Sequence, residues 1–402
     1  MRETLAAPIV RISVSGERKE EESGDVRVLV VLTQPPLPEG GAPGKVALGL
    51  LRGLMAHGLE VHALAARQRF ALAGEVPPDL PVEVVEVESP SRWAGRLGRF
   101  RRPRGELARG LFASRVREAA QEADILHLEE TETGWLSSGV NVPSVVHLHY
   151  LVRRDRDLGP PWDRRFREVL EFSLAERAAI RRHRYLVASS PLVAEDLLRR
   201  APHAEVALAP LSLDPANYMP APLDGAPTAG IVGTAAWPTS AAAMRELVEL
   251  VWPLVRRRVP EARLVVAGRG TATLGLSGDG VEVLGEVESA SALMQSLSVL
   301  LFPLRRGSGM KVKVLESIAS GVPVVTTPLG AEGIGGGDGI VVRAEPAELA
   351  AEAAELLLDP QARRERGAAA RAAFDARFRP EPATEPLMHL YERMVRKPGS
   401  RR

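Results

Sequence analysis

The sequence has no cysteine, few aromatic residues (4% of the chain) and no long apolar run. Without cysteine there can be no disulfide, no cysteine-bound metal and no thiol catalysis. Its longest apolar runs, such as LSVLLFP at 297–303, are shorter than the ~20 residues that a membrane-spanning helix needs. The first 24 residues lack the apolar core of a secretory signal. We therefore expect a cytoplasmic protein.

Neither sign of charge is in excess, because the sequence has 52 basic and 51 acidic residues. Nucleic-acid-binding proteins normally carry a basic surplus, so we expect no nucleic-acid partner. The basic residues themselves are uneven. Only five are lysines, and two of these are two positions apart. The lysines are at positions 19, 45, 311, 313 and 397.

Apolar strand-like runs alternate with amphipathic helical segments along most of the chain. The first run, 26–32, is followed by a glycine loop, a helical pattern at 45–58 and a second apolar run. Strand, loop, helix and strand in this order form a βαβ unit, which implies a parallel sheet. The alternation continues to residue 190 and restarts at 229, after a segment rich in proline and glycine. The pattern predicts an α/β protein with two doubly wound, Rossmann-like domains facing across a cleft.

We place the domain boundaries where the composition changes. Residues 1–24 are predicted to be a disordered arm, 25–212 the first domain, 213–228 a hinge and 229–380 the second domain. A closing helix at about 381–402 is expected to return to the first domain. Ligands bind such sheets at the carboxyl ends of the strands, so the loops after the strands are where function is sought.

The segment 303–334 carries the densest set of functional candidates. It leaves an apolar run, crosses a glycine-containing loop and begins a helix with Lys311, Lys313 and Glu316. Loop amides and a helix N-terminus favour an anion, and Lys313 and Glu316 share a helix face. A lysine at a diphosphate and a carboxylate at ribose hydroxyls would suit a nucleotide. The alternative is a surface ion pair worth only ~0.3–0.5 kcal/mol.

This segment resembles the donor-site signature of the retaining glycosyltransferases with the GT-B fold, family 4 (GT4), also called group 1 glycosyltransferases. Residues 231–270 are similar to the first βαβ unit of their nucleotide-binding domain, and 26–62 fit the start of their acceptor domain. The resemblance implies a hexosyltransferase-type enzyme that moves a sugar from a nucleotide diphosphate sugar to an acceptor, with retention. It implies no cofactor and no bound metal. A small molecule, a glycan or a lipid-linked molecule would be the acceptor.

The resemblance also suggests roles for individual residues. Glu316 matches the glutamate that binds the donor's ribose, and Lys313 matches a basic residue near the diphosphate. His149 ends a strand where the family often places a histidine beside the transferred sugar, although an ordinary strand-end histidine is the alternative. We expect His147 to point to the opposite face. The other implied donor contacts are Gly40, Gly41, Gly233, Gly307, Ser308, Gly309, Lys311, Gly330, Ala331 and Glu332.

One departure from the family affects the mechanism. Many members have a second glutamate eight positions before the ribose-binding one, where this chain has Ser308. A carboxylate nucleophile at that position is therefore excluded. This shifts the expected mechanism towards same-face displacement, in which the departing diphosphate takes the acceptor's proton. Lys313, with Lys311, Arg305 or Arg306, would stabilise the leaving group.

Two features are candidates for the acceptor side, and they favour acceptors of opposite charge. The stretch 91–110 mixes arginines with apolar residues. It could contact an anionic membrane, including the inner membrane face, or a phosphorylated acceptor, or it could be a solvated loop. The second feature is acidic, because Glu129 and Glu130 follow a strand and should face the cleft. Arg153 completes the candidate acceptor contacts.

Two other kinds of protein stay open at this level. A non-catalytic sugar-nucleotide-binding or scaffold protein would explain Ser308. A nicotinamide-dependent enzyme would also have Rossmann-like domains, but no strand here leads into the G-x-G-x-x-G loop with an acidic residue about 20 positions later.

Overall fold

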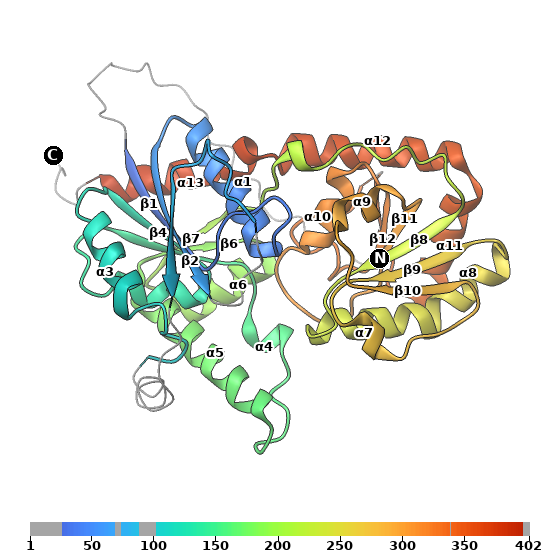
Figure 1. Ribbon diagram of the computed structural model, residues 1–402, viewed down its shortest axis with the longest axis horizontal. Coiled ribbons are helices and arrows are strands. Elements are labelled where there is room, and N and C mark those ends of the chain that lie inside the picture. The colour runs from blue at the N-terminus through green and yellow to red at the C-terminus, as the bar shows by residue number, and fades with distance from the viewer. Residues whose placement is uncertain (1–25, 69–73, 88–101, 338, 397–402) are drawn as a thin grey trace, which may run out of the picture.

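Two lobes, each a parallel sheet with helices on both faces, make up the protein (Figure 1). The computed structural model describes residues 26–68, 74–87, 102–337 and 339–396. The predicted arm at 1–24 and most of the basic stretch, 91–101, lie outside the described residues. Among the helices of the described part, none is long and apolar enough to cross a membrane.

The first sheet has seven strands in the order β3-β2-β1-β4-β5-β6-β7. Five of the six residues of β1 are buried, because helices cover both faces of a parallel sheet. The strands are β1 (Arg27–Leu32), β2 (Glu60–Gln68), β3 (Val82–Val87), β4 (Ile125–Glu129), β5 (Ser144–Leu148), β6 (Tyr185–Ala188) and β7 (Glu205–Leu208). The helices of this lobe are α1 (Ala42–Ala56), α3 (Gly110–Ala119), η1 (Thr131–Ser137), α4 (Val152–Asp155), α5 (Arg164–Arg182) and α6 (Pro191–Arg200).

The second sheet has six strands in the order β10-β9-β8-β11-β12-β13. Its strands are β8 (Thr228–Val232), β9 (Arg263–Ala267), β10 (Val281–Gly285), β11 (Val299–Phe302), β12 (Val324–Thr326) and β13 (Ile340–Val342). The helical segments after the first domain are η2 (Pro215–Asn217), α7 (Pro238–Glu246), η3 (Leu247–Val251), α8 (Trp252–Arg258), η4 (Thr271–Leu274), α9 (Ala290–Gln295), α10 (Val312–Ala319), α11 (Pro346–Leu358), α12 (Pro360–Arg377) and α13 (Pro380–Val395).

The predicted fold class is confirmed: both sheets are parallel and doubly wound. The stretch from 346 to 377 is two helices, because Pro360 starts a new helix that the Asp359 side chain caps by accepting from Gln361 N and Ala362 N. The sequence analysis did not predict α6, whose N-terminus the Ser190 side chain caps.

The closing helix α13 belongs spatially to the first lobe, where it lies against α1 (Figure 1). Leu387, Leu390, Tyr391 and Met394 are buried there together with the strands of the first sheet. The segment between the domains also contributes to a core, because the buried Tyr218 packs with the second domain. The two sheets reverse their strand order beside β1 and β8, and open α/β sheets bind ligands at such switch points.

Candidate active site

The loop between β11 and α10 touches the first domain directly. Gly309 has φ 69°, and a Cβ at this position would lie 1.8 Å from the carbonyl oxygen of His149. Gly307 has φ 131°, which is also unfavourable for residues with a side chain. Glycine at these two positions therefore allows this loop, called the donor loop below after its predicted role, to approach His149 and Asp155 of the first domain.

The side chain of Lys311 shapes this loop from within. Its Nζ donates to the carbonyl oxygens of Ser308 and Gly309, both at 2.6 Å. Burial lowers the pKa of Lys311 to about 8, although the Asp155 and Glu332 carboxylates oppose that change. Lys311 thus lies at the loop as predicted, and its ammonium group donates to the backbone of the loop itself.

Glu316 lies at the centre of a buried charged cluster formed by both domains. Its Oε1 accepts a hydrogen bond from Lys45 Nζ at 2.8 Å, and its Oε2 forms an ion pair with Lys313 Nζ at 2.6 Å. The Tyr218 hydroxyl donates to Oε1 at 3.3 Å. Burial alone would raise the pKa of Glu316, but the Lys313 and Lys45 ammonium groups hold it at about 2. Lys45 comes from α1 of the opposite domain and was not among the predicted site residues.

A second contact between the domains surrounds Ser308. Its Oγ donates to Asp155 Oδ2 at 2.5 Å and accepts from the Leu151 N–H at 2.7 Å. A carboxylate therefore does lie beside position 308, but it is supplied by α4 of the first domain. Burial raises the pKa of Asp155, against the effects of Lys311 and Ser308. The predicted donor contact Glu332 also crosses the domain boundary, accepting from the Leu192 N–H at 2.8 Å.

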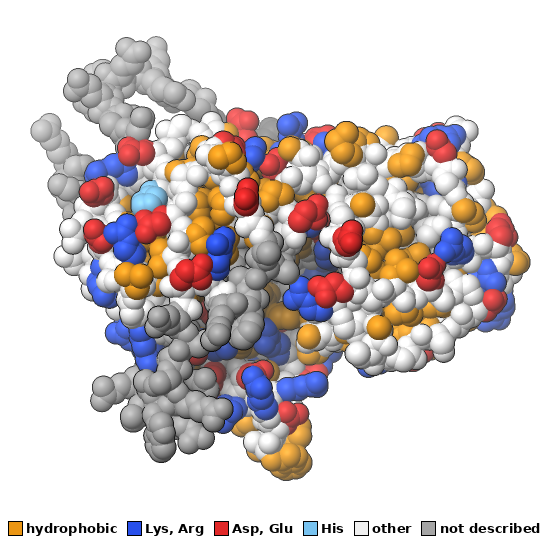
Figure 2. All heavy atoms as spheres, viewed as in Figure 1, with side chains coloured by type: hydrophobic (Ala, Val, Ile, Leu, Met, Phe, Trp, Pro, Cys, Tyr) orange, Lys and Arg blue, Asp and Glu red, His pale blue; other side chains and the backbone are white. Residues whose placement is uncertain are grey.

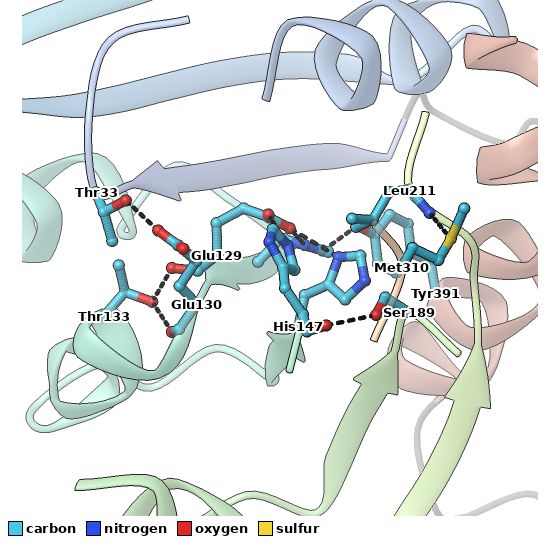
Figure 3. A network of polar contacts seen from close by, with 11 residues as sticks. Thr33, Glu129, Glu130, Thr133, His147, Ser189, Leu211, Met310 and Tyr391 are labelled. Carbon is cyan, nitrogen blue, oxygen red and sulfur yellow. Dashed lines mark hydrogen bonds and ion pairs between the residues drawn. The ribbon is translucent and has the colours of Figure 1, made fainter. Parts of the chain in front are cut away.

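The predicted residues of the first domain converge on one carboxylate, Glu129. Its Oε1 is 2.8 Å from His127 Nε2 and 2.9 Å from His147 Nδ1, and its Oε2 is 2.7 Å from His149 Nε2. His127 Nδ1 lies 2.5 Å from the Tyr391 hydroxyl of α13. Figure 3 shows this network running from Thr33 and Glu130 through Glu129 and His147 towards Tyr391.

The expectation for His147 was wrong. His147 and His149 both contact Glu129, because side chains two residues apart on a strand lie on the same face. Glu129 is also the register partner of His147 in the β4–β5 pair. The predicted acceptor role of Glu129 needs correction as well, since the residue is 3% exposed and both of its oxygens accept from histidines.

The acidic residues after β4 differ in their electrostatics. Burial raises the pKa of Glu129, but His147 and His149 outweigh it and hold the pKa well below its usual range. Burial and the neighbouring Glu130 raise the pKa of Glu132 to about 7. Burial lowers the pKa of His147 to about 4, whereas for His149 the carboxylate of Glu129 outweighs burial and the pKa is raised.

The remaining predicted residues lie in loops at the ends of elements. Gly41 precedes α1, and the Gly40 N–H donates to Leu37 O. Gly233 follows β8 and donates to Ala267 O. Thr327 supports Gly330 and Ala331, accepting from both backbone N–H groups. Arg153 is exposed on α4 and has no role in these networks.

A cavity of about 250 Å³ lies beside α5 in the first domain. It is lined by Arg104, Arg164, Arg167, Glu168 and Glu171. The Arg104 guanidinium stacks over Phe172 at 3.9 Å from the ring centre. Figure 2 shows further Lys and Arg side chains near the junction of the two lobes and around the projecting segment below it.

One group of side chains has the spacing of a metal site. His127, Glu129 and His147 offer ligand atoms within 4.8 Å of one another. Both imidazoles already face a single Glu129 oxygen at hydrogen-bond distance, so the three ligand atoms contact one another directly. We therefore describe the group as a hydrogen-bond network and assign no metal to it.

Two family models match the sequence, and each covers one lobe. "Glycosyl transferase 4-like domain" matches residues 41–211, and "Glycosyl transferases group 1" matches residues 226–359. The chain belongs to the group 1 glycosyltransferases. The predicted family and the prediction that the protein is a glycosyltransferase enzyme are thereby confirmed. A comparison with curated proteins gives no match.

Solved structures identify the fold of this glycosyltransferase as GT-B. Sucrose-phosphate synthase from Thermosynechococcus elongatus has a TM-score of 0.66 at 16% identity, over 92% of this chain and 99% of that one. HepE from Anabaena, in complex with UDP and glucose, has a TM-score of 0.60 at 15% identity, over 90% and 99%. TarM from S. aureus has a TM-score of 0.64 at 9% identity, over 91% and 99%.

Sequence reasoning missed several residues of this glycosyltransferase's site, and for some of them the composition held a signal. Lysine is rare in the chain, yet Lys45 joins Lys311 and Lys313 at the donor loop and α10. Tyrosine is rarer still, with four residues. Tyr218 contacts Glu316, and Tyr391 contacts His127. For Asp155 no such signal exists.

Proposed function

We propose that this glycosyltransferase moves a sugar from a nucleotide diphosphate sugar to an acceptor hydroxyl, with retention, by same-face displacement. The observation that supports this most directly is the convergence of Lys45, from the first domain, and Lys313 on the buried Glu316 of α10. A carboxylate and two ammonium groups at a helix N-terminus match what a ribose and a diphosphate need. HepE, which shares the fold, was solved with UDP and glucose.

In this proposal Lys45 and Lys313, which contact Glu316 in the structure, turn to the diphosphate of the donor when it binds. Lys45 and Lys313 neutralise Glu316 in the structure, and a bound diphosphate would offer them two further negative charges. Glu316 would then share its oxygens with the ribose hydroxyls. Lys311 holds the loop's carbonyl groups, so we assign it to loop geometry and indirect support of the phosphates. Because the lysines supply the positive charge, we propose that the reaction needs no bound metal.

The chemical step breaks the bond between the anomeric carbon and the diphosphate oxygen. The acceptor oxygen forms its bond to the same face of that carbon, and its proton passes to the departing diphosphate. Ser308 cannot act as a carboxylate nucleophile, and its hydroxyl is committed to Asp155 and the Leu151 N–H. Positioning and charge stabilisation of the leaving group must therefore supply most of the rate enhancement.

The acceptor side offers two groups, and both stay candidates. Glu130 and Glu132 lie after β4, and the arginine-lined cavity lies beside α5. The three arginines of the cavity, against two glutamates, favour an acceptor with a phosphate or carboxylate, which can be carried by a small molecule, a glycan or a lipid-linked molecule. TarM was solved with α-GlcNAc-glycerol, UDP and fondaparinux. A cytoplasmic location and a membrane contact through 91–110 stay predictions.

A non-catalytic sugar-nucleotide-binding protein is the second candidate function. It is favoured by one observation, which is that Ser308 and Glu316 are both fully engaged in contacts within the protein. In that case the charged cluster would join the domains and respond to a nucleotide without turnover.

A donor panel separates the two functions. Thermal shifts with UDP-, GDP- and TDP-sugars first identify a ligand, because binding to the folded state raises its stability. Hydrolysis of that donor and transfer to added acceptors are then followed by NMR, which also gives the anomeric configuration of the product. Turnover with retention supports the transferase, inversion contradicts the mechanism, and binding without any turnover favours the second function. The variant Glu316→Gln is compared in the same assays. Its control is Glu355→Gln, which makes the same change on the exposed side of α11.

A further inference from the structure

Glu129 is the centre of a polar network that lies behind the cleft. It accepts from three imidazoles, and the chain of contacts continues from His127 to Tyr391 on α13 (Figure 3). Four polar side chains in a protein core are costly unless they are hydrogen-bonded, and here almost every nitrogen and oxygen has a partner. The network brings residues from β4, β5 and the C-terminal helix together.

The hydrogen bonds fix where the protons are. An ionised carboxylate only accepts, so the imidazole nitrogens facing Glu129 must each carry a proton. Burial raises the pKa of Tyr391 well above its ordinary value, so the phenol keeps its proton. Donating that proton to His127 Nδ1 leaves the other proton of His127 on Nε2, towards Glu129. Tyr391 and Glu129 thereby favour the same tautomer of His127.

His149 is the end of the network that reaches the cleft. Its side chain is 10% exposed, against 0% for His127 and 4% for His147. Its carbonyl oxygen contacts Gly309 of the donor loop and accepts from Ser189 Oγ at 2.7 Å. Because Glu129 holds Nε2, the nitrogen of His149 that is left for a substrate is Nδ1.

We propose that Tyr391, His127 and Glu129 are positioning residues that fix the orientation and tautomer of His149, so that its Nδ1 faces the transferred sugar. The proposal rests on the proposed function for its substrate, but its geometry stands on the contacts alone. It makes α13 part of the active site. This helix follows α12 of the second domain and covers the first, so the site is complete only when the C-terminal segment has returned.

The test combines a spectroscopic readout with kinetics. Selective ¹⁵N labelling of the eight histidines reports the tautomer of each ring in the full-length protein. We expect protonated Nε2 at His127 and His149. In Tyr391→Phe, His127 Nδ1 loses its hydrogen-bond donor, so the resonances of His127 and, through Glu129, of His149 should shift. Glu129→Gln should lower kcat by about 10- to 100-fold and Tyr391→Phe by a smaller factor, with the donor KM nearly unchanged, as is typical of orienting partners.

Tyr185→Phe is the matched control, because it removes another hydroxyl from the first domain. The proposal is overturned if Tyr391→Phe leaves kcat and the His149 resonances as in the control. It is also overturned if the purified protein holds one equivalent of a metal ion that chelation removes with loss of these resonances. If no donor gives turnover while Tyr391→Phe still shifts the His127 and His149 resonances, the proposed function fails and the positioning geometry stands. If Glu129→Gln does not fold, Tyr391→Phe alone still tests the proposal, because it removes only one hydroxyl group from the network.

Discussion

Two buried glutamates, one in each domain, are held in different ways. Glu316 is 2% exposed and Glu129 is 3% exposed, and both have lowered pKa values. Lysines from both domains hold Glu316, whereas Glu129 is held by three histidines within the first domain. The first arrangement connects the domains, and the second connects a sheet to the C-terminal helix.

The difference shows how one fold can separate two tasks. Lysine is an ammonium cation over a wide pH range in most settings, so a carboxylate between lysines is a charge site suited to phosphates. Histidine titrates near neutral pH and has two distinct nitrogens, so a carboxylate between histidines selects tautomers and orientation. The proposed donor side thus consists of charged groups, and the Glu129 network consists of directional hydrogen bonds. Four experiments would break or sharpen this contrast.

Glu316→Ala should have the largest effect. It leaves the Lys45 and Lys313 ammonium groups without their carboxylate, and breaking a buried ion pair costs about 3–5 kcal/mol of unfolding free energy. Denaturant unfolding measures this loss, and donor titration should show weaker binding. The paired variant Lys45→Met with Glu316→Leu should recover much of the stability but not the donor affinity. Unchanged affinity in Glu316→Ala would remove the ribose role.

Lys313→Ala should act on the rate more than on stability. Lys45 still holds Glu316, but the leaving diphosphate loses a cation, which typically costs on the order of 10²–10³ in kcat. Steady-state kinetics with the identified donor measures this, with Lys45→Met as the comparison from the other domain. A rate equal to that of the wild type would transfer the diphosphate role to another residue.

His147 should make the first domain sensitive to acid before the second. Its folded pKa of about 4 is below the ordinary 6.5, so its contribution to stability is complete above pH 6.5 and is lost as the pH falls through 4. The loss amounts to about 3 kcal/mol at most. The folded pKa of Glu316 is also below its ordinary value. Its contribution to the stability of the folded protein is therefore complete above pH 4.5 and is lost as the pH falls towards 2.

Unfolding of the wild type and of His147→Asn, compared between pH 7 and 4.5, isolates this contribution. The stability advantage of the wild type should shrink as the pH falls. A constant difference over that range would show that His147 does not stay neutral in the folded protein.

Ser308→Ala should have the smallest effect. The Leu151 N–H loses its acceptor and Asp155 loses a donor, which costs about 1–3 kcal/mol for groups that stay buried. Because both contacts cross the cleft, small-angle scattering should show a more open average shape. An unchanged scattering profile with lowered stability would mean that the contact supports the loop without closing the domains.

The sequence predicted most of what depends on local pattern. Buried strands such as β1 and β11 are near-continuous apolar runs, and the helices between them follow the 3.6-residue period. The donor loop and the pair of Lys313 and Glu316 were found because their spacing along one helix is itself the signal. The error at His147 concerned a local rule and was avoidable.

Contacts between distant parts of the chain left no such pattern. Lys45 and Glu316 are 271 positions apart, and Tyr391 and His127 are 264 apart. Asp155 beside Ser308 could not be foreseen, because which α4 side chain reaches the loop depends on how the two lobes close.

The amino-acid sequence by itself determined the two doubly wound sheets, the family and the helix that carries Glu316, because strand and helix periodicity and a contiguous motif are encoded by residues close together in the chain. Only the tertiary structure decided which partners those residues have. A buried carboxylate takes whichever cation or imidazole the packing of the domains and of α13 brings within hydrogen-bond distance, and that distance is set by the closed fold as a whole.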